Sequence, residues 1–315
     1  MSLRLYFATI VIVVLILFNV FFILNSANFK SQIAGSQNNL KLSDNLRRDT
    51  QGFILPVSEA SYFPILDTNI ALPDIKAKAV VVYDVNSTKL LYARNIEEKM
   101  PVASLTKVLT ALVALEKLAL KDIATVLPEA LKVDGQKQDL FLGERVTVED
   151  LIKLMLIKSS NDAAYALVHH AQKNNIDFIK EMNKKTLEIG MFDSHFKDAA
   201  GLNDEAYSNA DDMIKLVSYS LSQSKLWDIM SQKSATIISL DGTEHNIQST
   251  NQLLDEVPGV LGGKTGYTER ALGCMVLAVQ VSNKDDKIIS IILGSPERFT
   301  DTKKIIEWAR QAYRW

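Results

Sequence analysis

The chain has 315 residues, of which 47% are hydrophobic and 23% charged, so it can bury one large core or two ordinary ones. Its formal net charge of −2 gives no sign of the basic surface that a nucleic-acid-binding protein needs. The single cysteine, Cys274, excludes an internal disulfide and a multi-cysteine metal site, and its apolar neighbours predict a buried thiol. The four histidines form no H-E-x-x-H pattern, so we do not expect a zinc hydrolase.

The first apolar segment runs from Leu5 to Leu24 and contains no charged residue. At about 1.5 Å per residue, a helix of this length just crosses a hydrocarbon core about 30 Å thick. The run is longer than a usual signal-peptide core and no A-x-A-like site follows it, which favours an uncleaved anchor over a cleaved signal peptide. Because Arg4 precedes the segment and Lys30 is the nearest positive charge after it, we expect residues 1–4 in the cytoplasm and the rest outside the membrane.

Residues 25–70 are rich in Asn, Ser and Gln and show little hydrophobic periodicity. This composition predicts an extracytoplasmic tether, within which Phe53–Pro56 and Tyr62–Leu66 are apolar enough to dock on a folded domain. The folded domain itself is expected to extend over residues 71–315.

Strand-like segments at both ends of this domain enclose a helical middle. Runs of apolar and β-branched residues predict strands at 77–84, 90–93, 235–240, 273–281 and 287–293. Apolar residues at helical spacing predict helices at 148–157, 162–172, 176–189, 211–221 and 300–313. We therefore expect an α/β fold of the α+β type, in which both chain ends build one antiparallel sheet flanked by helices, with a mostly helical subdomain inserted at about 118–230.

The stretch from Pro101 to Leu115 carries the first candidate site. It predicts a helix that is apolar on nearly every side, and Lys107 is its only charged residue. Burying an ammonium group is costly unless it loses its proton or finds partners. Ser104 lies one turn earlier on the same face, so a neutral Lys107 can take the hydroxyl proton and make Ser104 a nucleophile. The alternative is a core helix whose lysine reaches outward and whose serine caps the first turn.

Two later motifs separate these alternatives, because S-x-x-K also occurs at Ser194–Lys197 and Ser222–Lys225. Ser159–Asn161 (Ser-Ser-Asn) falls between two predicted helices and, by itself, is typical of a helix cap. Lys264–Gly266 (Lys-Thr-Gly) is the only K-[ST]-G in the chain and follows small residues that let a ligand approach a strand edge, although an exposed hairpin turn also fits it. Only the set that begins at Ser104 combines a buried helix with both later motifs in suitable order and spacing.

These three motifs resemble those of the penicillin-recognising serine acyltransferases. Neighbouring segments narrow the resemblance to the serine D-alanyl-D-alanine carboxypeptidases, the low-molecular-weight penicillin-binding proteins of bacterial cell-wall maturation, from about residue 75 onward. Many relatives carry a β-rich domain and an amphipathic membrane helix after the catalytic domain, whereas here the N-terminal segment is expected to anchor the protein. The middle motif reads Ser-Ser-Asn where Ser-Gly-Asn is common. The matching segments are Ala103–Lys107, Ser160–Ala164, Met182–Asn183, Gly190–Met191, Gly201–Leu202, Tyr207–Ser208, Asp211–Asp212 and Gly263–Thr268.

The resemblance implies a role for each residue of the site and requires no metal or cofactor. Lys107 is expected to take the proton of Ser104, Ser159 to relay a proton to the leaving amine, and Asn161 to hold Lys107 and the substrate amide. Lys264 is expected to bind the terminal carboxylate, and backbone N–H groups at the nucleophile and at Tyr267 to form an oxyanion hole. The implied catalytic residues are Ser104, Lys107 and Ser159, and the implied substrate-binding residues are Asn161, Lys264, Thr265, Gly266 and Tyr267.

The implied activity is removal of the terminal D-alanine from peptidoglycan stem peptides through an acyl-enzyme on Ser104, with β-lactams as covalent inhibitors. A DD-endopeptidase that cuts peptide crosslinks has the same motifs and stays an alternative. A class A β-lactamase needs a glutamate, in an E-x-x-L-N pattern, to activate the deacylating water. This chain has Ala199 at the glutamate position, and Asp198 is one residue off. We therefore expect slow deacylation of penicillin. A membrane-tethered β-lactam sensor would carry a longer cytoplasmic part than residues 1–4.

Overall fold

The computed structural model describes residues 63–132, 139–282 and 286–315. All of them belong to one compact unit. The predicted membrane span at 5–24, most of the predicted tether and the apolar segment at 53–56 lie outside the described residues. Within these residues, no helix is both long enough and apolar enough to cross a bilayer.

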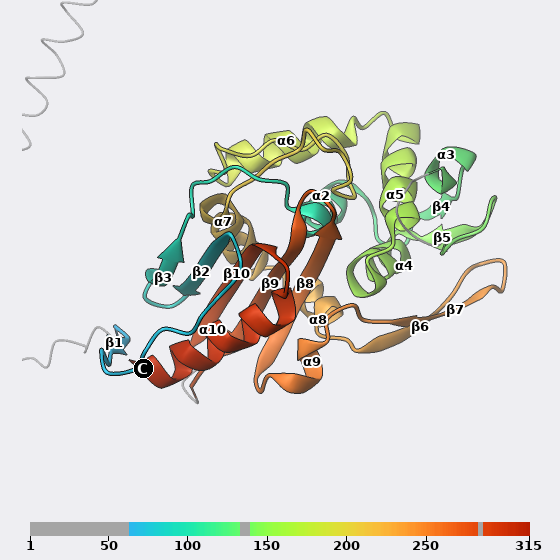
Figure 1. Ribbon diagram of the computed structural model, residues 1–315. Helices are drawn as coiled ribbons and strands as arrows, with labels where there is room; N and C mark the ends of the chain where they lie inside the picture. The colour runs from blue at the N-terminus through green and yellow to red at the C-terminus, as the bar shows by residue number, and fades with distance from the viewer. Residues whose placement is uncertain (1–62, 133–138, 283–285) are drawn as a thin grey trace, which may run out of the picture. The chain divides into compact units, whose positions relative to one another are not determined.

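A five-stranded antiparallel sheet in the order β3-β2-β10-β9-β8 lies at the centre of the domain (Figure 1). β2 pairs with β10 so that Val81 lies opposite Ile291, which joins the beginning and the end of the domain in one sheet. The predicted fold class, a sheet built from both chain ends and flanked by helices, is confirmed. The strands are β2 (Ala79–Asp84), β3 (Lys89–Arg94), β8 (Val260–Thr268), β9 (Leu272–Gln280) and β10 (Lys287–Ser295).

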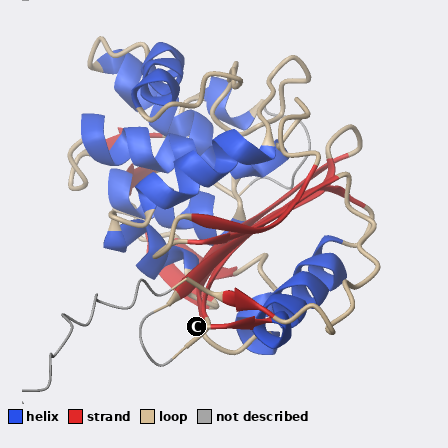
Figure 2. Cartoon of the chain, turned by 90° about the vertical axis from the view of Figure 1, so that its left-hand side faces the viewer, coloured by secondary structure: helices blue, strands red, loops and turns tan. Residues whose placement is uncertain are grey.

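Both faces of the sheet are buried because successive side chains point into two different cores. In β2, Val81 belongs to a large core shared with most of the helices, whereas Val80 and Val82 belong to a smaller core. Helix α10 (Arg298–Ala312) covers the smaller core, and the helical subdomain covers the opposite face of the sheet (Figure 2). The continuous β-branched run in the sequence thus reflects burial on both sides.

Helix α2 (Thr106–Lys117) lies inside the larger core, where its residues from Thr106 to Ala114 are all buried. This burial explains why the sequence is apolar on every side of the helix. The helices predicted around it are present with ends shifted by a few residues. They are α5 (Asn161–Lys173), α6 (Phe178–Glu188) and α7 (Ala210–Ser220), followed by the short α8 (Ser224–Met230).

The region 118–230 differs from its prediction in two places. It contains a small antiparallel sheet of β4 (Ile123–Thr125) and β5 (Arg145–Thr147), whose strands are too short to show a period in the sequence. The predicted helix at 148–157 is divided into α4 (Val148–Lys153) and a π-helical turn, η2 (Leu154–Lys158).

The remaining elements are α3 (Pro128–Leu131), the hairpin of β6 (Ser234–Ile238) and β7 (Glu244–Gln248), and α9 (Leu253–Glu256).

The described part of the chain begins beside its C-terminus (Figure 1). β1 (Ile65–Leu66), at the end of the predicted tether, pairs antiparallel with β11 (Tyr313–Arg314). The hydroxyl of Tyr313 donates to the carbonyl of Leu91 at 2.7 Å, which fixes this pair against β3. The described chain therefore starts at the end of the sheet where β3 and residues 313–315 lie.

Candidate active site

Ser104 lies in a single 3₁₀ turn, η1 (Ala103–Leu105), that leads directly into α2. Ala103 has a φ of 48°, in the left-handed region that is costly for residues with a side chain, so its surroundings must hold the turn in place. Lys107 Nζ lies 2.9 Å from Ser104 Oγ. Ser104 retains 9% exposure and Lys107 retains none, so the serine is the more accessible residue of the pair.

The second motif lies at the turn between η2 and α5. Ser159 has a φ of 66°, so the chain reverses there before α5 begins. Ser160 caps α5 by accepting a hydrogen bond from Ala163 N, which leaves the groups on either side free to face the first motif. Lys107 Nζ donates to Ser159 O at 2.8 Å and to Asn161 Oδ1 at 2.6 Å, and it lies 3.4 Å from Ser159 Oγ. The capping interpretation therefore fits Ser160 and not the other two residues.

The third motif lies on β8, the strand at the end of the sheet next to the helical subdomain. Lys264 is 1% exposed, and its Nζ donates to Ser159 Oγ at 2.8 Å and to Thr265 O at 2.8 Å. The hydroxyl of Thr265 lies 2.6 Å from that of Thr250. Ser159 Oγ thus lies between the two lysines and connects the third motif to the first.

Gly266 brings the backbone of β8 against the nucleophile. A Cβ atom at this position would lie 3.0 Å from Ser104 N and 3.1 Å from Ala103 Cβ, so a larger residue would push the strand away from the turn. Tyr267, the next residue, is 59% exposed. The eight residues that the sequence analysis assigned to the site therefore lie on neighbouring segments: the turn before α2, α2 itself, the turn before α5 with the first residue of α5, and β8.

The two lysines differ in what sets their protonation. Burial lowers the pKa of Lys107 to about 7, although the negative charges of Asp198, Asp162 and Asp139 partly oppose this effect. Burial also lowers the pKa of Lys264 well below its ordinary value, and repulsion by Lys107 lowers it further. A neutral Lys107 has a lone pair for the proton of Ser104 and two N–H donors for Ser159 O and Asn161 Oδ1.

Arg298 is a candidate site residue that the sequence analysis did not identify. It is the first residue of α10, and its charge is near enough to lower the pKa of Lys264. Its guanidinium carbon lies 6.0 Å from the centre of the Tyr267 ring, a cation–π distance. Gly273, which pairs with Tyr267 across β8 and β9, leaves the space through which the Arg298 side chain passes. No local pattern marks this arginine, because only the pairing of the strands brings α10 to the site.

Among the described residues, no group of three or more His, Cys, Asp or Glu side chains is arranged to hold a metal ion. Cys274 is fully buried on β9, as its apolar neighbours predicted, and burial raises the pKa of its thiol to about 11. The polar groups gathered at Ser104 are hydroxyls, amines and an amide, which suit acyl transfer through a serine.

The fold and this arrangement of side chains define the class of penicillin-binding serine enzymes. The chain belongs to the D-alanyl-D-alanine carboxypeptidase family, whose model matches residues 67–297. It is 29% identical to a D-alanyl-D-alanine carboxypeptidase of Bacillus subtilis over 76% of this chain, and the match spans 63% of the length of that relative. A D-alanyl-D-alanine endopeptidase of Haemophilus influenzae is 33% identical, with 62% of this chain and 68% of the relative covered.

Solved structures show the same fold. A D-alanyl-D-alanine carboxypeptidase from Mycobacterium tuberculosis superimposes with a TM-score of 0.70 at 26% identity, covering 77% of this chain and 94% of that one. A penicillin-binding protein from Listeria monocytogenes, solved with ampicillin bound, gives a TM-score of 0.64 at 29% identity, covering 75% of this chain and 99% of that one. The predicted family and its fold are confirmed.

Proposed function

We propose that this protein is a serine-type D-alanyl-D-alanine carboxypeptidase that removes the terminal D-alanine from peptidoglycan stem peptides through an acyl-enzyme on Ser104. The main support is the buried network in which Lys107 Nζ contacts Ser104 Oγ, Ser159 O and Asn161 Oδ1 at 2.9 Å or less. A lysine with a pKa of about 7 is half neutral at neutral pH, where a general base is most effective.

In the proposed acylation step, Lys107 takes the proton of Ser104 while Oγ attacks the carbonyl between the two D-alanines. The resulting oxyanion accepts hydrogen bonds from backbone N–H groups of Ser104 and Tyr267, which the contact at Gly266 brings close together. The proton then passes from Lys107 by way of Ser159 Oγ to the departing amine, the C–N bond breaks and D-alanine leaves. Water hydrolyses the ester on Ser104 and restores the hydroxyl.

The cationic side chains of Lys264 and Arg298 suit the terminal carboxylate of the substrate. Lys264 and Arg298 lie near enough for the charge of the arginine to act on the lysine. Without a bound substrate, burial lowers the pKa of both side chains. A bound carboxylate favours the charged form of Lys264, because an opposite charge nearby offsets desolvation. The Thr265 hydroxyl provides a further hydrogen bond donor beside them. We therefore assign Lys264, Thr265 and Arg298 to recognition of a free C-terminus.

The β-lactamase alternative receives no support from the loop at Ala199. This residue is fully buried, and its carbonyl oxygen accepts a hydrogen bond from Thr110 Oγ1 at 2.7 Å. The neighbouring carboxylate of Asp198 accepts hydrogen bonds from backbone N–H groups of its own loop. Neither residue supplies a free carboxylate for activating a deacylating water, so β-lactams fit the role of slowly released covalent inhibitors.

The test of substrate preference is a side-by-side digestion of two peptides by the full-length protein. We expect D-alanine release from a monomeric pentapeptide ending in D-Ala-D-Ala to be faster than cleavage of a crosslinked dimer, because the basic group at Lys264 and Arg298 favours a free carboxylate. Chromatography of the products separates D-alanine from the monomers that an endopeptidase would produce. Faster cleavage of the dimer would replace our assignment by the endopeptidase function that the Haemophilus relative carries in its name.

We also propose that residues 5–24 anchor the protein in the cell membrane, with the catalytic domain on the extracytoplasmic side. The support is the uncharged apolar run and the position of Arg4 before it. We expect the protein to sediment with membranes and to resist extraction at alkaline pH, while added protease degrades the domain in cells with a permeable wall. A variant with two arginines inserted in the run should lose the membrane association, and a soluble wild-type protein would contradict the anchor.

A further inference from the structure

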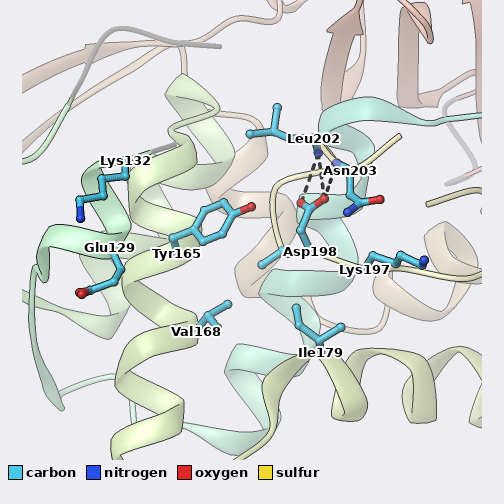
Figure 3. Close-up of a pocket in the computed structure, with 10 residues that line it drawn as sticks. Glu129, Lys132, Tyr165, Val168, Ile179, Lys197, Asp198, Leu202 and Asn203 are labelled. Atoms are coloured by element: carbon cyan, nitrogen blue, oxygen red, sulfur yellow. Dashed lines mark hydrogen bonds between the residues drawn. The ribbon is translucent and has the colours of Figure 1, made fainter. Parts of the chain in front are cut away.

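Asp198 lies in the wall of a pocket of about 470 Å³ next to the candidate active site (Figure 3). α5 forms one side of this pocket through Tyr165 and Val168, and Ile179 of α6 lies at its base. The opposite side is the loop at 198–203. The ring of Tyr165 points across the pocket toward Asp198 (Figure 3), and burial together with the charge of Asp198 raises the pKa of its hydroxyl to about 12.

The carboxylate of Asp198 is the centre of the loop that follows it. It accepts hydrogen bonds from four consecutive backbone N–H groups, and the side chain is only 7% exposed. The loop borders the pocket on this side, and the hydrogen bonds to Asp198 hold its backbone. The donors are Ala200 at 2.6 Å, Gly201 at 2.5 Å, Leu202 at 3.1 Å and Asn203 at 2.6 Å.

The same loop presses against the turn that carries the nucleophile. Gly201 has a φ of 80°, and a Cβ atom there would lie 1.9 Å from Ala103 O and 2.7 Å from Thr106 Oγ1. Thr110, one turn further along α2, donates to Ala199 O at 2.7 Å. The loop thus supports Ala103 in its left-handed conformation, and Ser104 is the next residue.

Asp198 also faces Lys107 from this side. The other carboxylates that act on Lys107 are those of Asp162 on α5 and of Asp139 before it. The cation on the other side is Lys264 on β8, which shares Ser159 Oγ with Lys107. Asp162 uses one oxygen to accept the backbone N–H groups of Asp139 and Leu140, at 2.7 and 2.8 Å. Of the three carboxylates, Asp198 exerts the largest charge effect on Lys107.

We propose that Asp198 is a positioning residue for acylation of Ser104: its carboxylate folds the loop at 198–203 into the support of the Ser104 turn and provides negative charge opposite Lys107. This inference rests on the proposed acyl-enzyme mechanism. The hydrogen bonds of Asp198 go to the backbone of its own loop, so its effect passes through the backbone of the turn and through the electric field at the base.

Two variants separate these contributions in the full-length protein. Asp198→Asn removes the charge and keeps one acceptor oxygen. We expect acylation by fluorescent penicillin at the pH plateau to slow by about 10- to 100-fold. The acid limb of the pH profile should also move to lower pH than in the wild type, because loss of the negative charge lowers the pKa of Lys107. Thr110→Val removes the hydrogen bond to Ala199 O, together with the longer contacts to Thr106 O and Met182 Sδ, and leaves the charge of Asp198 in place. The plateau rate should therefore fall by a smaller factor, with the acid limb unchanged. The matched control is Asp177→Asn, since Asp177 also accepts a backbone N–H, from Lys180, at the exposed start of α6.

The control variant should retain both the rate and the pH profile of the wild type, and thermal melting shows which variants are folded. A wild-type rate together with a wild-type acid limb in Asp198→Asn would overturn the positioning role while leaving the enzyme mechanism intact. If Asp198→Asn does not fold, an undiminished plateau rate in Thr110→Val overturns the support of the turn by this loop. Absence of labelling in the wild-type protein would instead contradict the proposed acyl-enzyme itself.

Discussion

Replacing Ser104 with alanine is expected to abolish covalent labelling by fluorescent penicillin and to reduce D-alanine release by at least about 10⁴-fold. The reason is that no other hydroxyl in the site has both a buried amine within hydrogen-bonding distance and an opening to substrate. Ser104 contacts Lys107 Nζ at 2.9 Å and is partly exposed, whereas Ser159 Oγ lies between the two lysines and is more deeply buried. Gel fluorescence and chromatography of released D-alanine measure the two effects.

Ser222→Ala is the matched control, because Ser222 and Lys225 form an S-x-x-K pattern on the surface. The Ser222 hydroxyl donates to Tyr219 O, and Lys225 pairs with Glu149 at 2.9 Å. This variant should retain labelling and activity within about twofold, in line with other exposed substitutions. Penicillin attached to a residue other than Ser104, or D-alanine release that persists in Ser104→Ala, would remove the basis of the proposed mechanism.

The sequence predicted the site well where local periodicity and chemistry agree. The stretch from Thr106 to Ala114 is apolar on all sides because all of its residues are buried, and its single lysine, Lys107, is fully buried at the expected face. The strands at 79–84 and 287–295 follow the β-branched runs, because both faces of the central sheet are covered. In these segments the local pattern and the tertiary environment impose the same requirement.

Features that depend on contacts between distant segments were not predictable. The apolar spacing continues through Leu154–Ile157, so periodicity gives no indication of the π-helical turn that orients Ser159 toward Lys107. Arg298 reaches Tyr267 only because β8, β9 and α10 pack together. The sequence analysis named Asp198 only as the residue next to the position of a β-lactamase glutamate. Its role in the loop that supports Ala103 was not predictable, because its hydrogen bonds depend on the backbone conformation of that loop. A single sequence contains no periodic signal for such contacts.

The rate of acylation should depend on pH through Lys107. Its pKa, lowered to about 7 by burial, lies below the ordinary value for lysine, so the amine is neutral above about pH 7 and protonated below it. Only the neutral form accepts the proton of Ser104, so the second-order rate constant for labelling by penicillin should be constant above this pH and fall tenfold for each pH unit below it. Stopped-flow fluorescence from about pH 5 to about pH 9 measures the profile.

The variant Lys107→Gln distinguishes this assignment from titration elsewhere in the site. Glutamine keeps a hydrogen bond donor toward Asn161 but cannot serve as a base, so we expect labelling to slow by about 10²- to 10⁴-fold and the acid limb near pH 7 to disappear. Lys225→Gln, in the exposed S-x-x-K pattern, should keep the wild-type rate and profile. If the limb persists in Lys107→Gln, another group controls acylation. Lys264 is then the first candidate, because its amine is equally buried, its pKa is also lowered, and it contacts Ser159 Oγ at 2.8 Å.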